Sequence, residues 1–311
     1  MTNSNPSSRY PLSSVSETHS LHCGYVTLVG RPNAGKSTLF NTLLGQRLSI
    51  VTAKPQTTRD RILGILTRPD SQLIFLDTPG LLEPQYKLHE SMEHQIQTAV
   101  RQADVVLLLI DATRPRDRLQ LVQAFLAANT RPLVTVLNKI DLVDTGRVAG
   151  LRHLLSSELG LESILPVSAL RGDNLDELLS RLITLMPSGP RLYPDDMIAE
   201  QPERFFVAEL IREAAFNNLE NELPYALGVT LDEFREGTDK TYIAAVLHVE
   251  RQSQKGIVIG RKGVRLREIG IQARREIEAM LERPVYLDLW VKVRRDWRRR
   301  QRDLSEFGYH G

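Results

Sequence analysis

Short apolar runs alternate with longer amphipathic segments through the first 187 residues. The runs end at Gly, Pro or Asp and have the length of strands buried on both faces, at 25–29, 73–76, 105–110, 133–137 and 164–167. The segments between them repeat apolar residues with helical spacing, at 37–44, 85–102, 119–129, 147–159 and 174–186, and residues 61–67 add an edge strand. This alternation predicts an α/β fold, a mostly parallel sheet with helices on both faces.

The pattern changes after residue 187. Prolines at 187, 190, 194 and 202, with little apolar periodicity, predict a linker over residues 188–203. Beyond it the spacing predicts a helix at 204–219, strands at 226–234 and 242–250, a short helix, a turn, a helix ending at 281 and a strand at 285–293. We therefore expect a disordered tail (1–22), an α/β domain (23–187), the linker, and an α+β domain with a basic C-terminal extension (204–311).

Charge is distributed unevenly along the 311 residues. The net charge of +2 hides a C-terminal segment, 251–311, with 16 Lys and Arg against 8 Asp and Glu. Such a segment fits either a polyanion partner or a solvated face of internal salt bridges. The single cysteine excludes an internal disulfide and fits a reducing compartment. No signal peptide is evident, and the longest apolar run is too short to span a membrane, so a cytoplasmic location is expected.

A glycine-rich phosphate loop follows the first predicted strand. The stretch GRPNAGKST fits G-x-x-x-x-G-K-S and opens a predicted helix, a context that argues against a simple glycine turn. Its backbone N–H groups would surround a phosphate, Lys36 would reach the β and γ oxygens, and Ser37 would bind Mg²⁺. The predicted nucleotide ligands here are Gly30, Arg31, Pro32, Asn33, Ala34, Gly35, Lys36, Ser37 and Thr38.

Two further motifs stand at predicted strand ends, and the second of them selects the base. In the first, Asp77, Thr78, Pro79 and Gly80, the aspartate can hold Mg²⁺ and the glycine N–H can bond a γ-phosphate. In the second, Asn138, Lys139, Ile140 and Asp141, one carboxylate can accept both guanine donors, N1–H and the 2-amino group, which adenine lacks. Ser168 and Ala169 follow the last strand, where the Ala169 N–H can reach guanine O6. GTP and GDP are therefore the expected ligands.

The turn Gly260-Arg261-Lys262-Gly263 joins two predicted helices within the α-β-β-α-α-β order. That order is typical of a type II KH domain, whose GxxG loop holds about four nucleotides of single-stranded backbone. Alone, such a turn is more often a plain connection, but its cations and the basic segment favour nucleic acid. The predicted RNA-binding residues are Ile257, Ile259, Gly260, Arg261, Lys262, Gly263 and Arg265. Trp290 is expected to pack in a strand, and stacking of Trp297 on RNA is a weaker alternative.

Together these motifs, with Gln56, Thr57, Thr58 and Arg59 between them, stand in the order of the five G motifs of translation-factor-type GTPases. With the C-terminal KH pattern, the chain resembles the Era family of bacterial ribosome-assembly GTPases from about Gly24 to Tyr309. The resemblance implies weak GTP hydrolysis, binding to the 3′ end of 16S rRNA, small (30S) subunit maturation and peripheral contact with the inner membrane. It also implies that residues 54–61 are switch I, with Thr58 on Mg²⁺ beside Ser37 and Asp77. We expect a monomer.

Catalysis is the least determined part of the site. The position after Gly80, where small signalling GTPases have a glutamine, holds Leu81, which cannot orient water. Some GTPases with this replacement use an asparagine at the place of Asn33 to hold K⁺. We therefore expect Asn33, Lys36, Thr58 and Gly80 to be catalytic, although Asn33 could instead only shape the loop. An alternative function is a membrane- or partner-docking switch with its basic end on anionic lipid, and an RNA-modifying enzyme ranks last.

Overall fold

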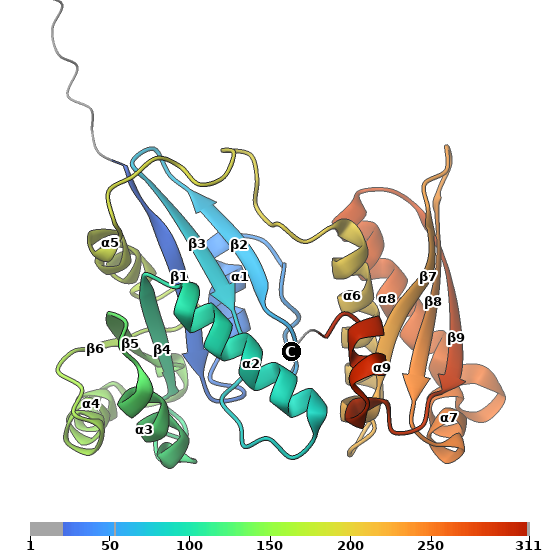
Figure 1. Cartoon of the computed structure of the whole chain (residues 1–311), viewed down its shortest axis with the longest axis horizontal. Helices are drawn as coiled ribbons and strands as arrows, with labels where there is room; N and C mark the ends of the chain where they lie inside the picture. Colours follow the sequence, from blue (N-terminus) through green and yellow to red (C-terminus); the bar gives the residue numbers. More distant parts are fainter. Residues whose placement is uncertain (1–20, 53, 310–311) are drawn as a thin grey trace, which may run out of the picture.

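A six-stranded sheet forms the first domain of the computed structural model, which describes residues 21–52 and 54–309 (Figure 1). Its order is β2-β3-β1-β4-β5-β6, and every neighbouring pair is parallel except β2–β3. The strands are β1 (His22–Gly30), β2 (Ile62–Thr67), β3 (Ser71–Asp77), β4 (Val105–Asp111), β5 (Leu133–Asn138) and β6 (Ile164–Pro166). The predicted mostly parallel sheet and its edge strand β2 are confirmed. The strand β1 includes His22, and the rest of the predicted tail except Leu21 lies outside the described residues.

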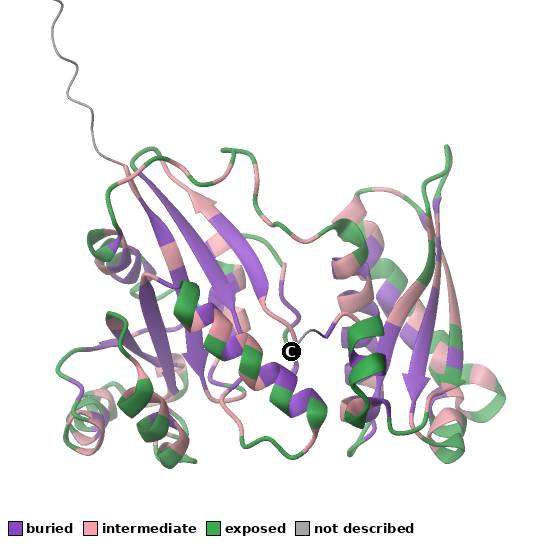
Figure 2. Ribbon diagram, in the orientation of Figure 1, coloured by how far each residue is buried: buried purple, intermediate pink, exposed green. Residues whose placement is uncertain are grey.

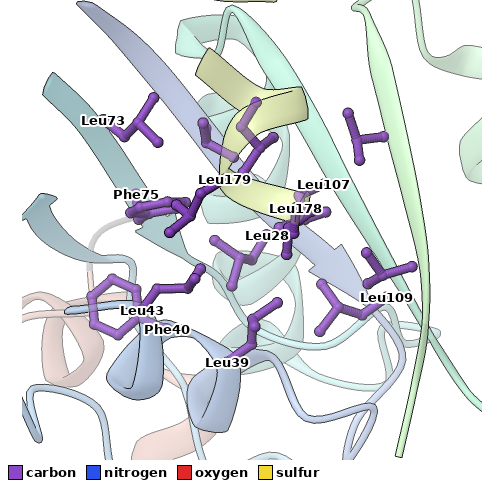
Figure 3. Close-up of a cluster of buried hydrophobic side chains, with 14 of the residues drawn as sticks. Leu28, Leu39, Phe40, Leu43, Leu73, Phe75, Leu107, Leu109, Leu178 and Leu179 are labelled. Carbon is purple, nitrogen blue, oxygen red and sulfur yellow. The ribbon is translucent and has the colours of Figure 1, made fainter. Parts of the chain in front are cut away.

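Five helices cover the two faces of this sheet. They are α1 (Lys36–Leu44), α2 (Lys87–Gln102), α3 (Leu119–Ala128), α4 (Thr145–Leu159) and α5 (Leu175–Leu185). Alternate residues of β4 enter opposite cores: Leu107 packs with α1 and α5, and Leu108 packs with α3 and α4. Figure 3 shows the first of these cores, with leucines of the strands meeting those of α1 and α5. Burial on both faces explains why the strands read as continuous apolar runs.

The predicted linker is packed against the first domain. Ile65 of the edge strand β2 donates its N–H to the carbonyl of Ile198 at 2.9 Å. The Gln72 side chain accepts the N–H groups of Leu192 and Tyr193 at 2.8 and 3.0 Å. Residues 192–199 therefore cover an edge that would otherwise expose unpaired backbone groups.

The second domain has three strands and the predicted α-β-β-α-α-β order. Its elements are α6 (Glu203–Asn218), η2 (Pro224–Ala226), β7 (Gly228–Arg235), β8 (Thr241–Val249), α7 (Gln252–Ile259), η3 (Arg261–Gly263), α8 (Val264–Leu281) and β9 (Val285–Val293). β7 is antiparallel to β8, and β8 is parallel to β9. Figure 1 shows α6 and α8 on the side of this sheet that faces the first domain.

The basic extension folds back into the interface between the domains. It forms η4 (Trp297–Arg299) and α9 (Gln301–Glu306), and Trp297 is completely buried, with its Nε1 donating to the Ala226 carbonyl at 2.9 Å. Trp297 packs in one cluster with Leu88 and Met92 of α2. The alternative that Trp297 stacks on RNA is therefore wrong. The prediction that Trp290 packs is wrong as well, because 60% of its surface is exposed.

Two arginines of this extension are engaged by acidic residues. Arg294 pairs with Asp303 at 2.7 Å and also with Glu306. Arg298 pairs with Glu250 and lies over the Tyr86 ring, 4.8 Å from its centroid. For these two residues the internal salt-bridge interpretation of the basic segment holds.

Candidate functional site

The carboxyl ends of β1, β3 and β5 bring the predicted nucleotide motifs to one edge of the first sheet, as expected for a doubly wound fold. A cavity of about 330 Å³ opens there. Its lining residues are Pro32, Asn33, Gly35, Lys36, Ser37, Thr38, Ile50, Val51, Thr52, Gln56, Thr57, Thr58, Gly80 and Lys139. The phosphate loop and the segment predicted as switch I therefore face each other across the same space.

Lys36 lies at the floor of this cavity with little access to solvent. Its Nζ donates to the carbonyls of Gly30 and Arg31, each at 3.1 Å. Burial lowers the pKa of Lys36 to about 8, although the Asp77 carboxylate raises it in opposition. A phosphate in the cavity would offer the ammonium the anionic partner that these neutral carbonyls do not supply.

Two glycines are required here by close backbone approach. A Cβ on Gly35 would lie 2.2 Å from the Asn138 amide nitrogen, and φ at Gly35 is +95°. A Cβ on Gly80 would lie 2.5 Å from the Pro32 nitrogen. Gly80 is thereby held against the phosphate loop, where its N–H can donate a hydrogen bond to a γ-phosphate.

Hydroxyl groups converge on the buried Asp77 carboxylate. Ser37 Oγ donates to Asp77 Oδ2 at 2.7 Å, Ser49 Oγ does so at 2.7 Å, and Thr58 Oγ1 lies 3.5 Å away. Among the described residues Asp77 Oδ1 has no hydrogen-bond partner, and burial raises the pKa of this carboxyl. Ser37 Oγ and Thr58 Oγ1 are 2.9 Å apart. This set of hard oxygens, one of them buried and unsatisfied, fits Mg²⁺.

Ser49 is the member of this cluster that the sequence analysis missed. It stands in the stretch RLSIVTA, which matches no nucleotide-binding motif. Only the folding of residues 47–52 over α1 brings it to Asp77, through bonds of the Asn41 side chain to the Leu48 and Ser49 N–H groups.

Asn138 connects the phosphate loop with the base-recognition loop. Its amide donates to the Ala34 carbonyl at 2.8 Å and its carbonyl accepts the Ala169 N–H at 2.9 Å. The Asp141 carboxylate is oriented by Ser168 Oγ at 2.6 Å, and Lys139 pairs with Asp111 at 2.6 Å. Hydrogen bonds thus join Asn138 to Ala169 and Asp141 to Ser168 across the two base-recognition segments, while Lys139 is held by Asp111.

Two predicted ligands turn their side chains away from the cavity. Arg31 pairs with Asp117, in the loop after β4. Thr78 Oγ1 donates to the Leu28 carbonyl at 2.6 Å, so its side chain holds the end of β3 against β1. Asn33 is exposed at the mouth of the cavity with φ of 64°.

A second candidate site surrounds the glycine turn between α7 and α8. Both turn glycines have positive φ, 73° at Gly260 and 78° at Gly263, and Arg261 and Lys262 are exposed between them. A groove of about 760 Å³ lies beside the turn. It is lined by Ser253, Gly256, Ile257, Gly260, Arg261, Lys262, Val264, Arg265 and Glu268. Ile259, predicted to contact RNA, is partly buried and packs against the core of the domain.

A second groove, of about 380 Å³, continues between α8 and β9. It is lined by Gly263, Leu266, Arg267, Gly270, Ile271, Arg274, Leu287 and Leu289. The sequence analysis missed this part, although Arg267 and Arg274 are seven positions apart and so share one helical face. We call it the α8–β9 groove.

The segment predicted as switch I contacts the second domain directly, which the sequence analysis did not anticipate. Arg59 is buried and donates to the carbonyls of Leu227, Tyr225 and Pro224 at 2.7, 3.0 and 3.1 Å. Arg47 pairs with Glu213 of α6 at 2.6 Å. Burial lowers the pKa of Arg59, the direction expected for a cation surrounded by neutral acceptors.

The orientation of Asp141 yields a test of base recognition. Asp141→Asn should weaken GTP binding by about a hundredfold or more, because one charged acceptor for two guanine donors is lost. The same variant should gain affinity for xanthosine triphosphate, whose 2-oxo group accepts from the new amide. Competition binding with GTP and xanthosine triphosphate measures the two changes in affinity. Unchanged GTP affinity would contradict this assignment.

Comparisons with known proteins agree with this arrangement. A family described as "50S ribosome-binding GTPase" matches residues 25–139, and the KH domain family matches residues 222–298. GTPase Era of Geotalea daltonii is 43% identical over 290 residues, covering 93% of this chain and 98% of that protein. GTPase Era of Nitratidesulfovibrio vulgaris is 44% identical over 286 residues, covering 88% and 92%.

Two solved structures are similar over nearly the whole chain. Era in complex with MgGDPNP and nucleotides 1506–1542 of 16S ribosomal RNA has a TM-score of 0.90 at 42% identity, covering 94% of this chain and all of that one. An Aquifex aeolicus Era variant bound to GDP and AlF4⁻ has a TM-score of 0.89 at 42% identity, with the same coverage. With the nucleotide-binding edge and the KH turn in one chain, this protein belongs to the Era family of GTPases.

Proposed function

We propose that this protein is a GTP-hydrolysing switch that binds the 3′ end of 16S rRNA through its KH domain and assists maturation of the 30S subunit. The observation that carries the proposal is the direct bonding of switch I to the KH domain through Arg59. The related Era structure holds MgGDPNP together with a 16S fragment. The name of the matching GTPase family mentions the 50S subunit, but 16S rRNA belongs to the small subunit.

Lys36, Ser37, Thr58 and Asp77 carry the nucleotide chemistry in this proposal. Lys36 donates to the β- and γ-phosphate oxygens, and Asp77 orients Ser37 and Thr58 through the hydrogen bonds described above. Mg²⁺ held there would neutralise charge that develops on the phosphates during transfer. The Gly80 N–H senses the γ-phosphate, so loss of that phosphate releases both Thr58 and Gly80.

Asn33 is proposed as a K⁺ ligand beside the phosphates. Leu81 donates its N–H to the Gly30 carbonyl at 3.0 Å and packs its side chain against the core, so it orients no water. A monovalent cation at Asn33 would supply part of the positive charge that another GTPase takes from a glutamine or an arginine finger.

Hydrolysis should therefore be faster in K⁺ than in Na⁺ at equal ionic strength. Asn33→Ala should remove the difference while leaving GDP affinity within a few fold, because Lys36 and the loop backbone remain. Single-turnover phosphate release in the two salts measures this. Equal rates in K⁺ and Na⁺ for the unaltered protein would refute the K⁺ assignment.

RNA binding by the glycine turn can be tested at Gly263. A Cβ at this position meets nothing within 4 Å, whereas one at Gly260 would lie 2.8 Å from the Arg265 Cβ. Gly263→Asp therefore places a negative charge at the phosphate approach without a backbone collision. It should abolish RNA binding and spare basal hydrolysis, whereas Gly263→Asn, which lacks the charge, should lose less. Intact RNA binding by Gly263→Asp would contradict the clamp.

Nucleotide control of RNA binding is proposed to pass through switch I. Thr58 approaches Asp77 while its neighbour Arg59 donates to KH-domain carbonyls, so γ-phosphate and the KH domain both act on one short segment. An ordinary coupling of about 1–3 kcal/mol would make RNA bind 5- to 150-fold more tightly in the GTP state.

The first measurement is the affinity for 16S 3′-end RNA with GDP and with a non-hydrolysable GTP analogue at fixed salt. Tighter binding with the analogue is expected. Arg59→Lys keeps the charge but cannot reach all three carbonyls, so it should reduce the ratio of the two affinities and leave GTP affinity intact. Equal affinities for the unaltered protein would leave two modules without coupling.

Location and assembly state stay predictions: cytoplasmic, in peripheral contact with the inner membrane, and monomeric. None of the helices within residues 21–52 and 54–309 is long and apolar enough to cross a bilayer. Arg294 and Arg298 pair with acidic residues. These two cations therefore give little support to the alternative that the basic end binds anionic lipid.

A further inference from the structure

One face of the KH sheet packs on α6 and α8. On the opposite face the C-terminal extension covers the end near His248, whose ring centroid lies 4.6 Å from that of Phe307. Along β8 and β9, alternate residues such as Ile243, Ala245, Leu289 and Val291 enter the core with α6 and α8. The residues between them project from the opposite face. Figure 2 shows the strands of the first sheet as largely buried, whereas β9 is partly exposed along its length. We call this opposite face the outer sheet face.

Three aromatic residues lie on the outer sheet face. Tyr242 and Tyr286 are register partners and stack, with centroids 5.7 Å apart and planes inclined by 11°. Trp290 lies four residues along β9 from Tyr286, roughly 13 Å at the rise of a strand. Tyr286 is 52% exposed and Trp290 is 60% exposed. Large aromatic rings are rarely left so exposed on a strand, and none of these three contributes to the nucleotide site.

Cations accompany the two tyrosines. The Arg235 guanidinium lies 5.3 Å from the Tyr242 centroid, and Lys240 Nζ lies 5.6 Å from the Tyr286 centroid. The nearby acidic residues are engaged: Glu233 with Arg235, Asp232 with Lys292, and Asp288 with the Trp290 Nε1 at 3.0 Å. Aromatic faces next to side-chain cations are the combination that binds bases and phosphates of a single strand.

The outer sheet face is continuous with the α8–β9 groove. β9 is an edge strand, since the sheet order is β7-β8-β9. Leu287 and Leu289 of β9 line the groove, while Tyr286 and Trp290, one position away, project from the opposite face. A single-stranded RNA that leaves the groove therefore has only the width of β9 to cross before it reaches an aromatic ring.

We propose that the outer sheet face is a second single-stranded RNA platform, on which Trp290 and the Tyr242–Tyr286 pair stack bases that extend past the KH groove. The inference rests on the proposed RNA-binding function and deepens it. A KH turn holds about four nucleotides, so a longer single strand needs further surface. Continuity with the groove and the cations over the tyrosines favour RNA over a protein partner on this face.

The test uses 16S 3′-end fragments of rising length, at fixed salt and with the GTP analogue present. For the unaltered protein, affinity should rise again once the fragment exceeds the length held by the turn. Trp290→Ala should weaken the longest fragment roughly 5- to 150-fold, the usual effect of removing one stacking residue, and leave the shortest bound fragment unchanged. Trp290→Phe retains a ring and should restore most of the loss.

Fluorescence gives an independent readout, because the chain has two tryptophans and Trp297 is completely buried. Long fragments should quench the emission and protect it from acrylamide, whereas the shortest fragment should not. Trp290→Phe should abolish both effects while still binding the long RNA.

The outcomes separate the two proposals. Failure of every fragment to bind the unaltered protein would overturn the KH function itself. Normal binding of short fragments, with Trp290→Ala weakening no fragment selectively, would overturn only the platform. If Trp290→Ala binds all RNAs normally but loses affinity for purified 30S subunits, the face contacts a protein, which also overturns the platform.

Discussion

The two halves of the molecule depend on one buried cation, Arg59. Its guanidinium donates to three backbone carbonyls and lies 5.7 Å from the Phe216 ring centroid and 5.8 Å from that of Trp297. No carboxylate appears among these contacts, so dehydration of the charge is offset by hydrogen bonds and ring faces alone. Such an arrangement needs the loop at 224–227, α6 and the C-terminal extension in place together. Movement of any one of them would break part of this set of contacts.

The nucleotide site also buries charged groups, in this case a cation and a carboxylate. Lys36 and Asp77 are both buried. Burial lowers the pKa of Lys36 and raises the pKa of Asp77, so it favours the neutral form of each side chain. A bound nucleotide and Mg²⁺ would supply the missing partners, phosphate oxygens for the ammonium and a divalent cation for the carboxylate. Because Thr58 bonds this carboxylate and precedes Arg59, the nucleotide state and the domain contact involve consecutive residues. Strain or disorder in switch I therefore cannot be confined to one domain.

The sequence predicted the elements that are determined by neighbouring residues. It missed the contacts between residues that are far apart along the chain. The strand β4 is apolar from Val105 to Ile110 because both its faces are buried there, and the phosphate loop is defined by backbone chemistry between a strand and a helix. Ser49 and Arg59 act through partners at Asp77 and Leu227, and no spacing rule connects those positions. Alternation on β9 was evident, but it does not say which face of a sheet a helix covers. For that reason Trp290 was wrongly predicted to pack, and stacking of Trp297 on RNA was left open as an alternative.

These two tryptophans also show how the chain connects the outer sheet face of β9 with helix α2 of the first domain. Trp290 projects from the outer sheet face, and seven residues later Trp297 packs on Leu88 and Met92 of α2, the helix that follows Gly80. Between them Arg294 donates its N–H to the Val249 carbonyl at 2.7 Å, which continues the β8–β9 pairing to the end of the strand. The connection from β9 to the residues that pack on α2 is therefore short and hydrogen-bonded. A shift of α2 would therefore act on the C-terminal extension through Trp297, while switch I acts through Arg59 on the loop at 224–227, and the Arg59 guanidinium lies 5.8 Å from the Trp297 ring.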